Sequence, residues 1–190
     1  DMAYTAESYS RHILQIRPDD ICFSVPKLFF AYGFGNSITF PFSVGASSVL
    51  LPGRPEPAAI LGMIARFGPT IFFGLPTLYT ALLHHPAIEH ANLSSVRLCI
   101  SAAEVLSQDL FDQWKSRFGH EIVEGLGSTE ALHIYLSNTT TARKLGSAGR
   151  RVPGYEIRLT TPEGEPVPRG EAGVMSVRGH SNAPCYWDRA

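Results

Sequence analysis

Residues 97–130 read RLCISAAEVLSQDLFDQWKSRFGHEIVEGLGSTE and contain a strand, a helix and a second strand in succession. The apolar runs 97–100 and 121–123 have the length and composition of buried strands. Between them lies a stripe of apolar side chains at helical spacing, namely Leu110, Phe111, Trp114 and Phe118. Ser107 can cap this helix at its start, and Gly119 can end it. The stretch therefore predicts a strand–helix–strand unit of a parallel sheet.

The same pattern occurs upstream, where short apolar runs at 21–25, 48–51 and 70–73 also predict strands. Residues 56–67 place apolar side chains on one helical face before Gly68-Pro69, and Pro76 suits the first turn of a further helix. The fold class that follows is α/β, with a mostly parallel sheet covered by helices on both faces.

The texture of the sequence changes near Thr139, where a polar stretch begins. Residues 155–159 and 173–178 then alternate between apolar and polar side chains, as half-buried strands do. We therefore predict two parts: an α/β subdomain over residues 1–140 and a β-rich segment over 141–190.

Composition excludes several classes of protein. Of 190 residues, 44% are hydrophobic and 17% charged, which is typical of a folded domain and not of a disordered chain. Sixteen basic residues against 17 acidic ones give a net charge of −1, so we expect neither a nucleic-acid partner nor a membrane surface. No apolar run reaches the roughly 18 residues of a membrane helix. Three widely spaced cysteines favour a reducing compartment, and we expect a cytoplasmic protein.

Ligands of parallel sheets bind beyond the carboxyl ends of the strands, and three such loops have unusual composition. The loop 27–36, KLFFAYGFGN, mixes aromatic residues with glycine, which suits a flat apolar pocket for an aromatic ligand. A tightly packed strand–helix elbow fits that composition equally well. The loop 101–105, SAAEV, has small residues against which a flat ring can lie, although a plain turn also explains it.

The third loop, residues 124–130, reads EGLGSTE. Glycines permit close approach of a phosphate, the hydroxyls are neutral donors, and a carboxylate can hold a Mg²⁺ ion that bridges to a polyphosphate. A second interpretation is a glycine turn in which Ser128 or Thr129 caps a helix with Glu130 in its first turn. The sequence contains no GxxxxGK[ST] loop and no GxSxG elbow, which excludes a Walker-type nucleotide site and a hydrolase nucleophile elbow in this segment.

These three loops, in this order, resemble the adenylate-forming superfamily of acyl-CoA synthetases, luciferases and peptide-synthetase adenylation domains. Residues 127–130 resemble its Gly-x-Thr-Glu motif, 165–173 its later Pro-x-Gly-x-x-Gly signature, and 185–187 its Gly-Tyr-Trp-like segment. Within the superfamily, residues 27–36 and 127–138 are most similar to the benzoate-CoA ligase group.

The resemblance implies roles for particular residues. Thr129 would contact the α-phosphate, and Glu130 would bind Mg²⁺. The adenylate would lie along Ala102, Ala103, Glu104, Glu124, Gly125, Leu126, Gly127, Ser128 and Thr129. The aryl carboxylate would lie among Phe30, Ala31, Tyr32, Gly33 and His133. Many members have an aromatic residue at the position of Leu126 and a histidine at the position of Phe30. Leucine offers no ring to stack on adenine, and phenylalanine cannot take a proton. For His133, a buried core histidine is the alternative interpretation.

The implied function is that of an ATP-dependent aryl acid:CoA ligase, which activates benzoate or a hydroxybenzoate as acyl-AMP and transfers it to CoA. ATP and Mg²⁺ would be required, with CoA as co-substrate. We expect the 190 residues to be a central fragment that is inactive alone, because the superfamily's phosphate loop, Thr-Gly-Asp segment and C-terminal domain are missing from them. Two alternatives stay open: a ligase for another carboxylate, alicyclic or fatty, and a non-catalytic α/β binding module.

Overall fold

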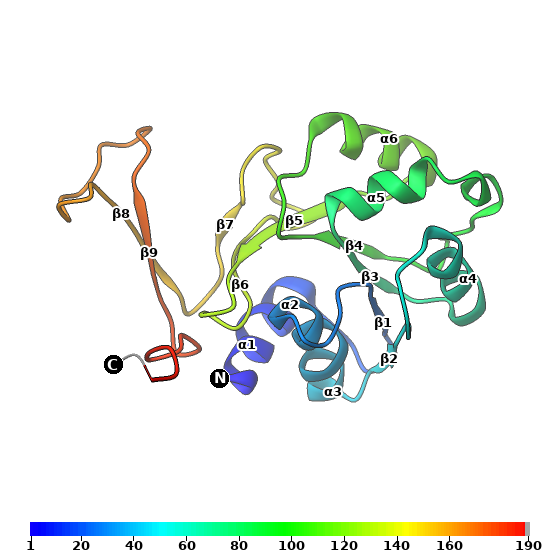
Figure 1. The fold of residues 1–190 in the computed structure, drawn as a ribbon, viewed down its shortest axis with the longest axis horizontal. Coiled ribbons are helices and arrows are strands. Elements are labelled where there is room, and N and C mark those ends of the chain that lie inside the picture. Colours follow the sequence, from blue (N-terminus) through cyan, green and yellow to red (C-terminus); the bar gives the residue numbers. More distant parts are fainter. Residues whose placement is uncertain (189–190) are drawn as a thin grey trace.

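The computed structural model describes residues 1–188, and a seven-stranded sheet forms its centre (Figure 1). The strand order is β2-β1-β3-β4-β5-β6-β7. The parallel strands are β1 (Ile21–Ser24), β2 (Ser47–Val49), β3 (Ile71–Gly74), β4 (Leu98–Ser101) and β5 (Ile122–Gly127). Two antiparallel strands follow at one edge, β6 (Ile134–Ser137) and β7 (Arg150–Arg151). The mostly parallel sheet is thus confirmed, whereas β6 and β7 were not predicted.

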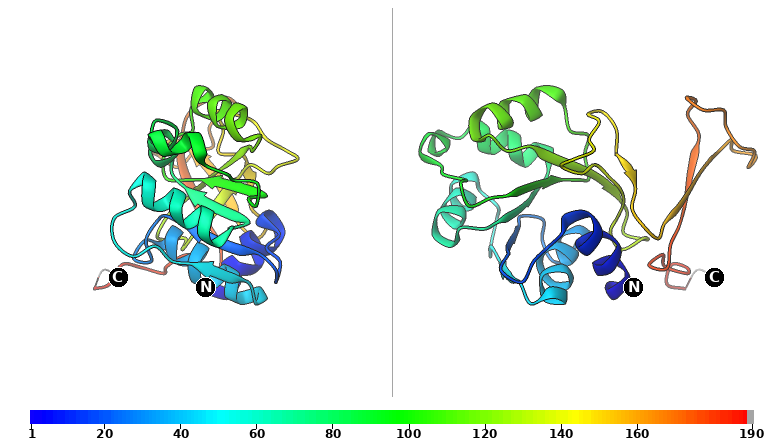
Figure 2. Two further views of the ribbon diagram at one scale, coloured as in Figure 1. Left: turned by 90° about the vertical axis from the view of Figure 1, so that its right-hand side faces the viewer. Right: turned by 180° about the vertical axis from the view of Figure 1, so that it is seen from behind.

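Helices cover both faces of the sheet, as predicted (Figure 2). One face carries α4 (Pro57–Phe67), α5 (Pro76–Leu83), the 3₁₀ turn η3 (Pro86–His90) and α6 (Gln108–Phe118). The other face carries α1 (Met2–Thr5), the π-helix η1 (Ala6–Leu14), α2 (Ala31–Phe34), the π-helix η2 (Gly35–Thr39) and α3 (Phe40–Val44). Across residues 1–188, no helix combines the length and the apolar character needed to cross a lipid bilayer.

Three residues predicted to mark helix ends occupy those positions in the structure. The Ser107 hydroxyl accepts a hydrogen bond from the amide of Leu110 at 3.2 Å, and Gly119 ends α6 in the left-handed conformation with φ of 73°. Pro76 occupies the first turn of α5, where its missing N–H costs no hydrogen bond.

Alternation of side chains along the strands divides the core into two layers. On β3, Ile71 and Phe73 face the α1–α3 side, whereas Phe72 faces the α4–α6 side. All three are fully buried. Because helices cover both faces of the sheet, the ends of the strands are the part of the sheet that a ligand can reach.

Beyond β7 the chain forms a separate antiparallel hairpin of β8 (Glu156–Thr160) and β9 (Val174–Arg178), which extends away from the large sheet in Figure 1. These are the strands predicted for a partial barrel. Although β7 lies beyond residue 140, it belongs to the large sheet. The division of the chain at that residue stays a prediction.

A charged cluster lies at the opposite, amino-terminal ends of the strands. Asp20 is 3% exposed, and its carboxylate accepts hydrogen bonds from Arg97 at 2.6 Å and from the Thr70 hydroxyl at 2.6 Å. Burial alone would raise the pKa of Asp20, but the hydrogen bonds from Arg97, Thr70 and the amide of Arg17 hold it below its ordinary value.

We therefore predict that Arg97→Ala lowers the free energy of unfolding by about 2 kcal/mol at pH 6, because it leaves a buried carboxylate without its cation. The pKa of Asp20 is lower in the folded state than in the unfolded chain. The stabilisation is therefore complete above about pH 4 and is lost as the pH falls further. Urea unfolding at pH 6 and pH 3 measures this, with the exposed Arg169→Ala as control. An equal loss at both pH values would contradict the prediction.

Candidate active site

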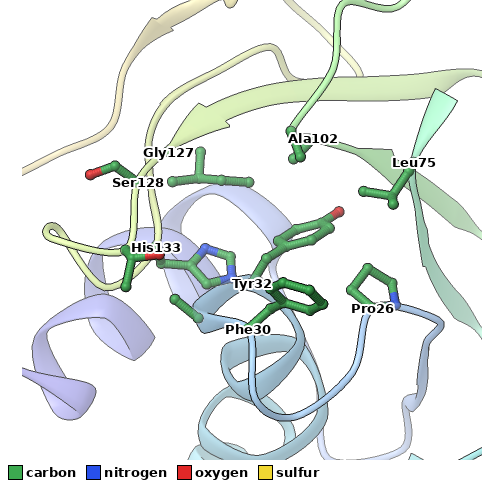
Figure 3. Close-up of a pocket in the computed structure, with 12 residues that line it drawn as sticks. Pro26, Phe30, Tyr32, Leu75, Ala102, Gly127, Ser128 and His133 are labelled. Carbon is green, nitrogen blue, oxygen red and sulfur yellow. The ribbon is translucent and has the colours of Figure 1, made fainter. Parts of the chain in front are cut away.

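An apolar cavity of about 260 Å³ opens at the carboxyl ends of β1, β3, β4 and β5 (Figure 3). It is lined by Pro26, Phe30, Ala31, Tyr32, Leu75, Ala102, Ala103, Gly127, Ser128, Thr129, His133 and Ile134. The three loops singled out in the sequence therefore meet at one place, as the strand-end argument requires.

The first wall of the cavity is aromatic. Phe30 has an extended backbone just before α2, and Ala31 and Tyr32 form the first turn of that helix. Gly33 does not line the cavity: a Cβ there would lie 2.1 Å from the carbonyl oxygen of Lys27, so glycine is needed for the helix to pack on the loop. The loop combines both features, because Phe30, Ala31 and Tyr32 form a pocket wall while Gly33 makes the tight elbow; an aromatic ligand for this pocket stays a prediction.

His133 lies deep in the site and is 3% exposed. Its Nε2 is 3.2 Å from Oδ1 of Asn36, and its ring packs among Tyr9, Tyr32 and Phe40. Burial lowers the pKa of His133 to about 3, so the imidazole is neutral at physiological pH. The residue is both a core histidine and part of the cavity wall, and it cannot act there as a cation.

Small residues after β4 form a second part of the wall. Ala102 is buried, and Ala103 has a positive φ of 71°. Glu104 does not line the cavity. Its exposed carboxylate accepts hydrogen bonds from the amide and hydroxyl of Thr77, at 3.1 and 3.0 Å, which ties this loop to the start of α5.

The third part is a tight reversal between β5 and β6. A Cβ at Gly127 would lie 2.5 Å from the carbonyl oxygen of His133, so only glycine allows the two strands to approach this closely. The hydroxyl of Ser128 accepts a hydrogen bond from the amide of Ala131 at 3.3 Å, and Leu132 adopts a positive φ of 66°. The interpretation of Ser128 or Thr129 as a helix cap is therefore wrong, because the chain returns as β6 and not as a helix.

Three predicted residues lie beneath the cavity and not in its wall. Gly125 leaves room for Ile134, whose Cδ1 would be 2.9 Å from a Cβ there, and Leu126 packs on the core. Glu124 is buried, with Oε1 accepting a hydrogen bond from the amide of Leu106 at 3.0 Å. Burial raises the pKa of Glu124 above its ordinary value.

Glu130 is exposed and lies beside the cavity, outside its lining. The Tyr186 hydroxyl donates a hydrogen bond to Oε1 of Glu130 at 2.6 Å, and this bond lowers the pKa of the carboxyl. Within residues 1–188, no three His, Cys, Asp or Glu side chains form a group that could hold a metal ion. A cation at Glu130 would therefore take most of its ligands from bound phosphate and water, which is the usual mode for Mg²⁺.

Three lining residues were missed in the sequence: Pro26, Leu75 and Ile134. Pro26 and Leu75 follow β1 and β3 closely, so the strand-end rule was sufficient to find them. Pro26, Leu75 and Phe30 also line an adjoining cavity of about 320 Å³, which continues along Val25, Lys27, Pro55, Thr77 and Leu78. Phe30 therefore belongs to the walls of both cavities.

The mostly parallel α/β sheet, with an apolar cavity and a Gly-Ser-Thr-Glu turn at its strand ends, has the fold of the adenylate-forming enzymes. The chain belongs to the AMP-binding enzyme family, whose sequence profile matches residues 1–187. It is 46% identical to the benzoate–CoA ligase of Thauera aromatica over 99% of its own length and 36% of that enzyme. It is 42% identical to the 4-hydroxybenzoate–CoA/benzoate–CoA ligase of Rhodopseudomonas palustris over 97% of its length and 34% of that enzyme.

Solved structures agree with this assignment. A benzoate CoA ligase from Burkholderia xenovorans LB400 superposes with a TM-score of 0.93 at 44% identity, over 99% of this chain and 38% of that one. An anthranilate CoA ligase in complex with anthranoyl-AMP gives a TM-score of 0.94 at 42% identity, over 96% of this chain and 36% of that one. The chain thus spans about a third of the length of the relatives it matches.

The contact at Gly127 generates a stability prediction. Gly127→Ala should lower the free energy of unfolding by about 2 kcal/mol or more, because its Cβ meets backbone atoms that cannot move aside. Gly62→Ala is the matched control: Gly62 lies within α4, a Cβ there meets nothing within 4 Å, and alanine should stabilise the helix by about 0.5–1 kcal/mol. Urea unfolding of both variants checks the opposite signs. A neutral Gly127→Ala would show that β5 and β6 separate without cost.

Proposed function

We propose that the full-length protein is an ATP-dependent aryl acid:CoA ligase, which activates benzoate or a hydroxybenzoate as acyl-AMP and transfers the acyl group to CoA. The observation that carries the proposal is the small cavity with flat aromatic walls beside the Gly127–Glu130 turn, in a chain closely similar to benzoate-CoA ligases. ATP, Mg²⁺ and CoA would be required. The phosphate loop and C-terminal domain would come from the rest of the parent chain.

The aryl acid is assigned to the wall of Phe30, Ala31 and Tyr32, with His133 beside Tyr32 and Gly33 supporting the elbow. The cavity volume of about 260 Å³ is below the usual range of small-molecule pockets, roughly 300–1,000 Å³, which favours a short flat acid over a long alkyl chain. Because His133 is neutral, it forms no ion pair with the substrate carboxylate. The ring is selected by shape and apolar contact, and the carboxylate must face the nucleotide side.

The adenylate is assigned to the opposite side of the cavity. Adenine would lie along Ala102, Ala103 and Glu104, where small side chains admit a flat ring. The rest of the adenylate would lie at Gly127 and Ser128, which line the cavity, and residues 124–126 would support this end of β5 from within the core. Thr129 would donate a hydrogen bond to the α-phosphate. Leu126 provides no aromatic surface on which adenine could stack, so the alanine loop would carry the contact with the ring.

A carboxylate oxygen of the acid would attack the α-phosphorus of ATP and displace pyrophosphate, and charge repulsion between the anions opposes this attack. Mg²⁺ bound to Glu130 would supply positive charge against the polyphosphate, and a carboxylate that is exposed and ionised suits this ion. The hydroxyl of Thr129 adds a donor, and the aromatic wall holds the acid in line with the phosphorus. Transfer to the thiol would follow through the adjoining cavity, with Phe30 between the two spaces.

We place this reaction in the cytoplasm, in the degradation of aromatic acids. The cysteines support a reducing compartment, since Cys22, Cys99 and Cys185 are all free thiols. The two-part organisation, with an α/β subdomain over 1–140 and a β-rich segment over 141–190, remains part of the proposal.

The substrate assignment is tested by ATP–pyrophosphate exchange in the full-length protein with benzoate, hydroxybenzoates, an alicyclic acid and a long-chain fatty acid. We expect exchange with the benzoates and little with the fatty acid. The reverse order would identify a ligase for another carboxylate, and no exchange with any acid would favour a binding module. The isolated 190-residue chain is expected to give no aroyl-CoA.

The role of Glu130 is tested by Glu130→Gln, which keeps the size of the side chain and removes its charge. At limiting Mg²⁺ the exchange rate should fall by about 100-fold or more, because a charge that stabilises the polyphosphate is lost. The free energy of unfolding should change by less than about 0.5 kcal/mol, since the residue is exposed. Glu163→Gln, on the exposed turn of the β8–β9 hairpin, is the control. Parallel losses of exchange and stability would indicate a purely structural role.

A further inference from the structure

The segment that follows β9 donates hydrogen bonds to the turn that contains Glu130. The Ser181 hydroxyl donates to the carbonyl oxygen of Ala131 at 2.8 Å, and the amide of Ala183 donates to the carbonyl oxygen of Glu130 at 2.7 Å. Ser181 is buried, and its hydroxyl is also 2.7 Å from the hydroxyl of the buried Tyr155. The backbone of the turn therefore has fixed partners about 50 residues away in the sequence.

The same segment also reaches the side chain of Glu130. Tyr186 follows Ala183 by three residues, and its hydroxyl donates to Oε1 of Glu130 at 2.6 Å. Glu130 is thus held at its carbonyl oxygen by Ala183 and at its carboxylate by Tyr186. A carboxylate has two oxygens and about four lone pairs, so the bond at Oε1 leaves Oε2 for another ligand.

An exposed glutamate without such a partner has three free side-chain torsions, and ordering them costs conformational entropy when a ligand binds. A hydrogen bond to one carboxylate oxygen restricts these torsions before the ligand binds. Carboxylates that ligate metals are commonly held in this way by an outer partner, whose loss weakens metal binding by about 10–100-fold.

We propose that Tyr186 is a positioning residue for Glu130, which orients the carboxylate so that Oε2 can receive the cation of the metal–nucleotide complex. This inference rests on the proposed function, because it takes Glu130 as the ligand of Mg²⁺. Tyr186 touches neither nucleotide nor acid in this role and acts only through Glu130. The hydroxyl is neutral, so it orients the carboxylate without competing as a cation.

The test is Tyr186→Phe in the full-length protein, which removes the hydroxyl and keeps the ring. The matched control is Trp187→Phe, because Trp187 is the adjacent aromatic residue and is 98% exposed. Binding of Mn²⁺ in the presence of ATP, followed by the electron paramagnetic resonance signal of the free ion, gives a readout that does not depend on turnover. Exchange is then measured as a function of Mg²⁺ concentration.

We expect Tyr186→Phe to weaken Mn²⁺ binding by about 10-fold and to raise the half-saturating Mg²⁺ concentration by a similar factor. The exchange rate at saturating Mg²⁺ and the thermal unfolding midpoint should stay near those of the wild type, and Trp187→Phe should change neither metal parameter. Unchanged metal binding would overturn the proposal. So would tighter binding, which would mean that Tyr186 competes with the metal, or a loss of exchange that Mg²⁺ does not restore.

Failure of the proposed function has a different signature. A wild-type protein that binds Mn²⁺ with ATP but exchanges with no acid would refute the ligase assignment, while the effect of Tyr186→Phe on metal affinity would still decide the role of Tyr186. Wild-type protein that binds no Mn²⁺ with ATP would overturn both.

Discussion

The site depends on the close approach of β5 and β6 at Gly127, where the backbone of one strand lies against the carbonyl of His133. This contact makes the chain reverse within a few residues. Ser128 and Thr129 consequently face the cavity, Glu130 lies on the outer side of the turn, and His133 returns into the core. A longer or looser loop would separate these groups, so one backbone contact determines the spacing between Thr129 and His133 in the cavity wall.

Much of the α/β architecture could be predicted from periodicity and local signals. Ser107, Gly119 and Pro76 mark helix ends through interactions within a few residues, and buried apolar runs identify the parallel strands. The antiparallel strand β6 was missed because the turn before it also fits the start of a helix, and β7 was missed because it has only two residues. The hydroxyl of Ser128 fits a helix cap and a tight turn equally well, and only the positive φ of Leu132 separates the two.

The candidate site was also predictable only in part. The convergence of three loops followed from the rule that parallel strands share a carboxyl edge, and residues such as Phe30, Ala102 and Thr129 were found in this way. The actual positions of Glu104 and Glu124 could not be predicted, because their partners, Thr77 and Leu106, are identified only by the folded structure. The hydrogen bonds from residues 181–186 to the turn at Glu130 could not be predicted either, because these residues are about 50 positions away in the sequence.

Phe30 contributes to the walls of two adjoining cavities, so any substitution of its side chain changes the shape of both. A smaller residue that made room for a bulkier ring on one side would widen the opening on the other. A substitution at Phe30 that changes the shape of the first cavity therefore also changes the neighbouring one. Tyr32 and Ile134 line only the first cavity, so a change at either residue would alter that space alone.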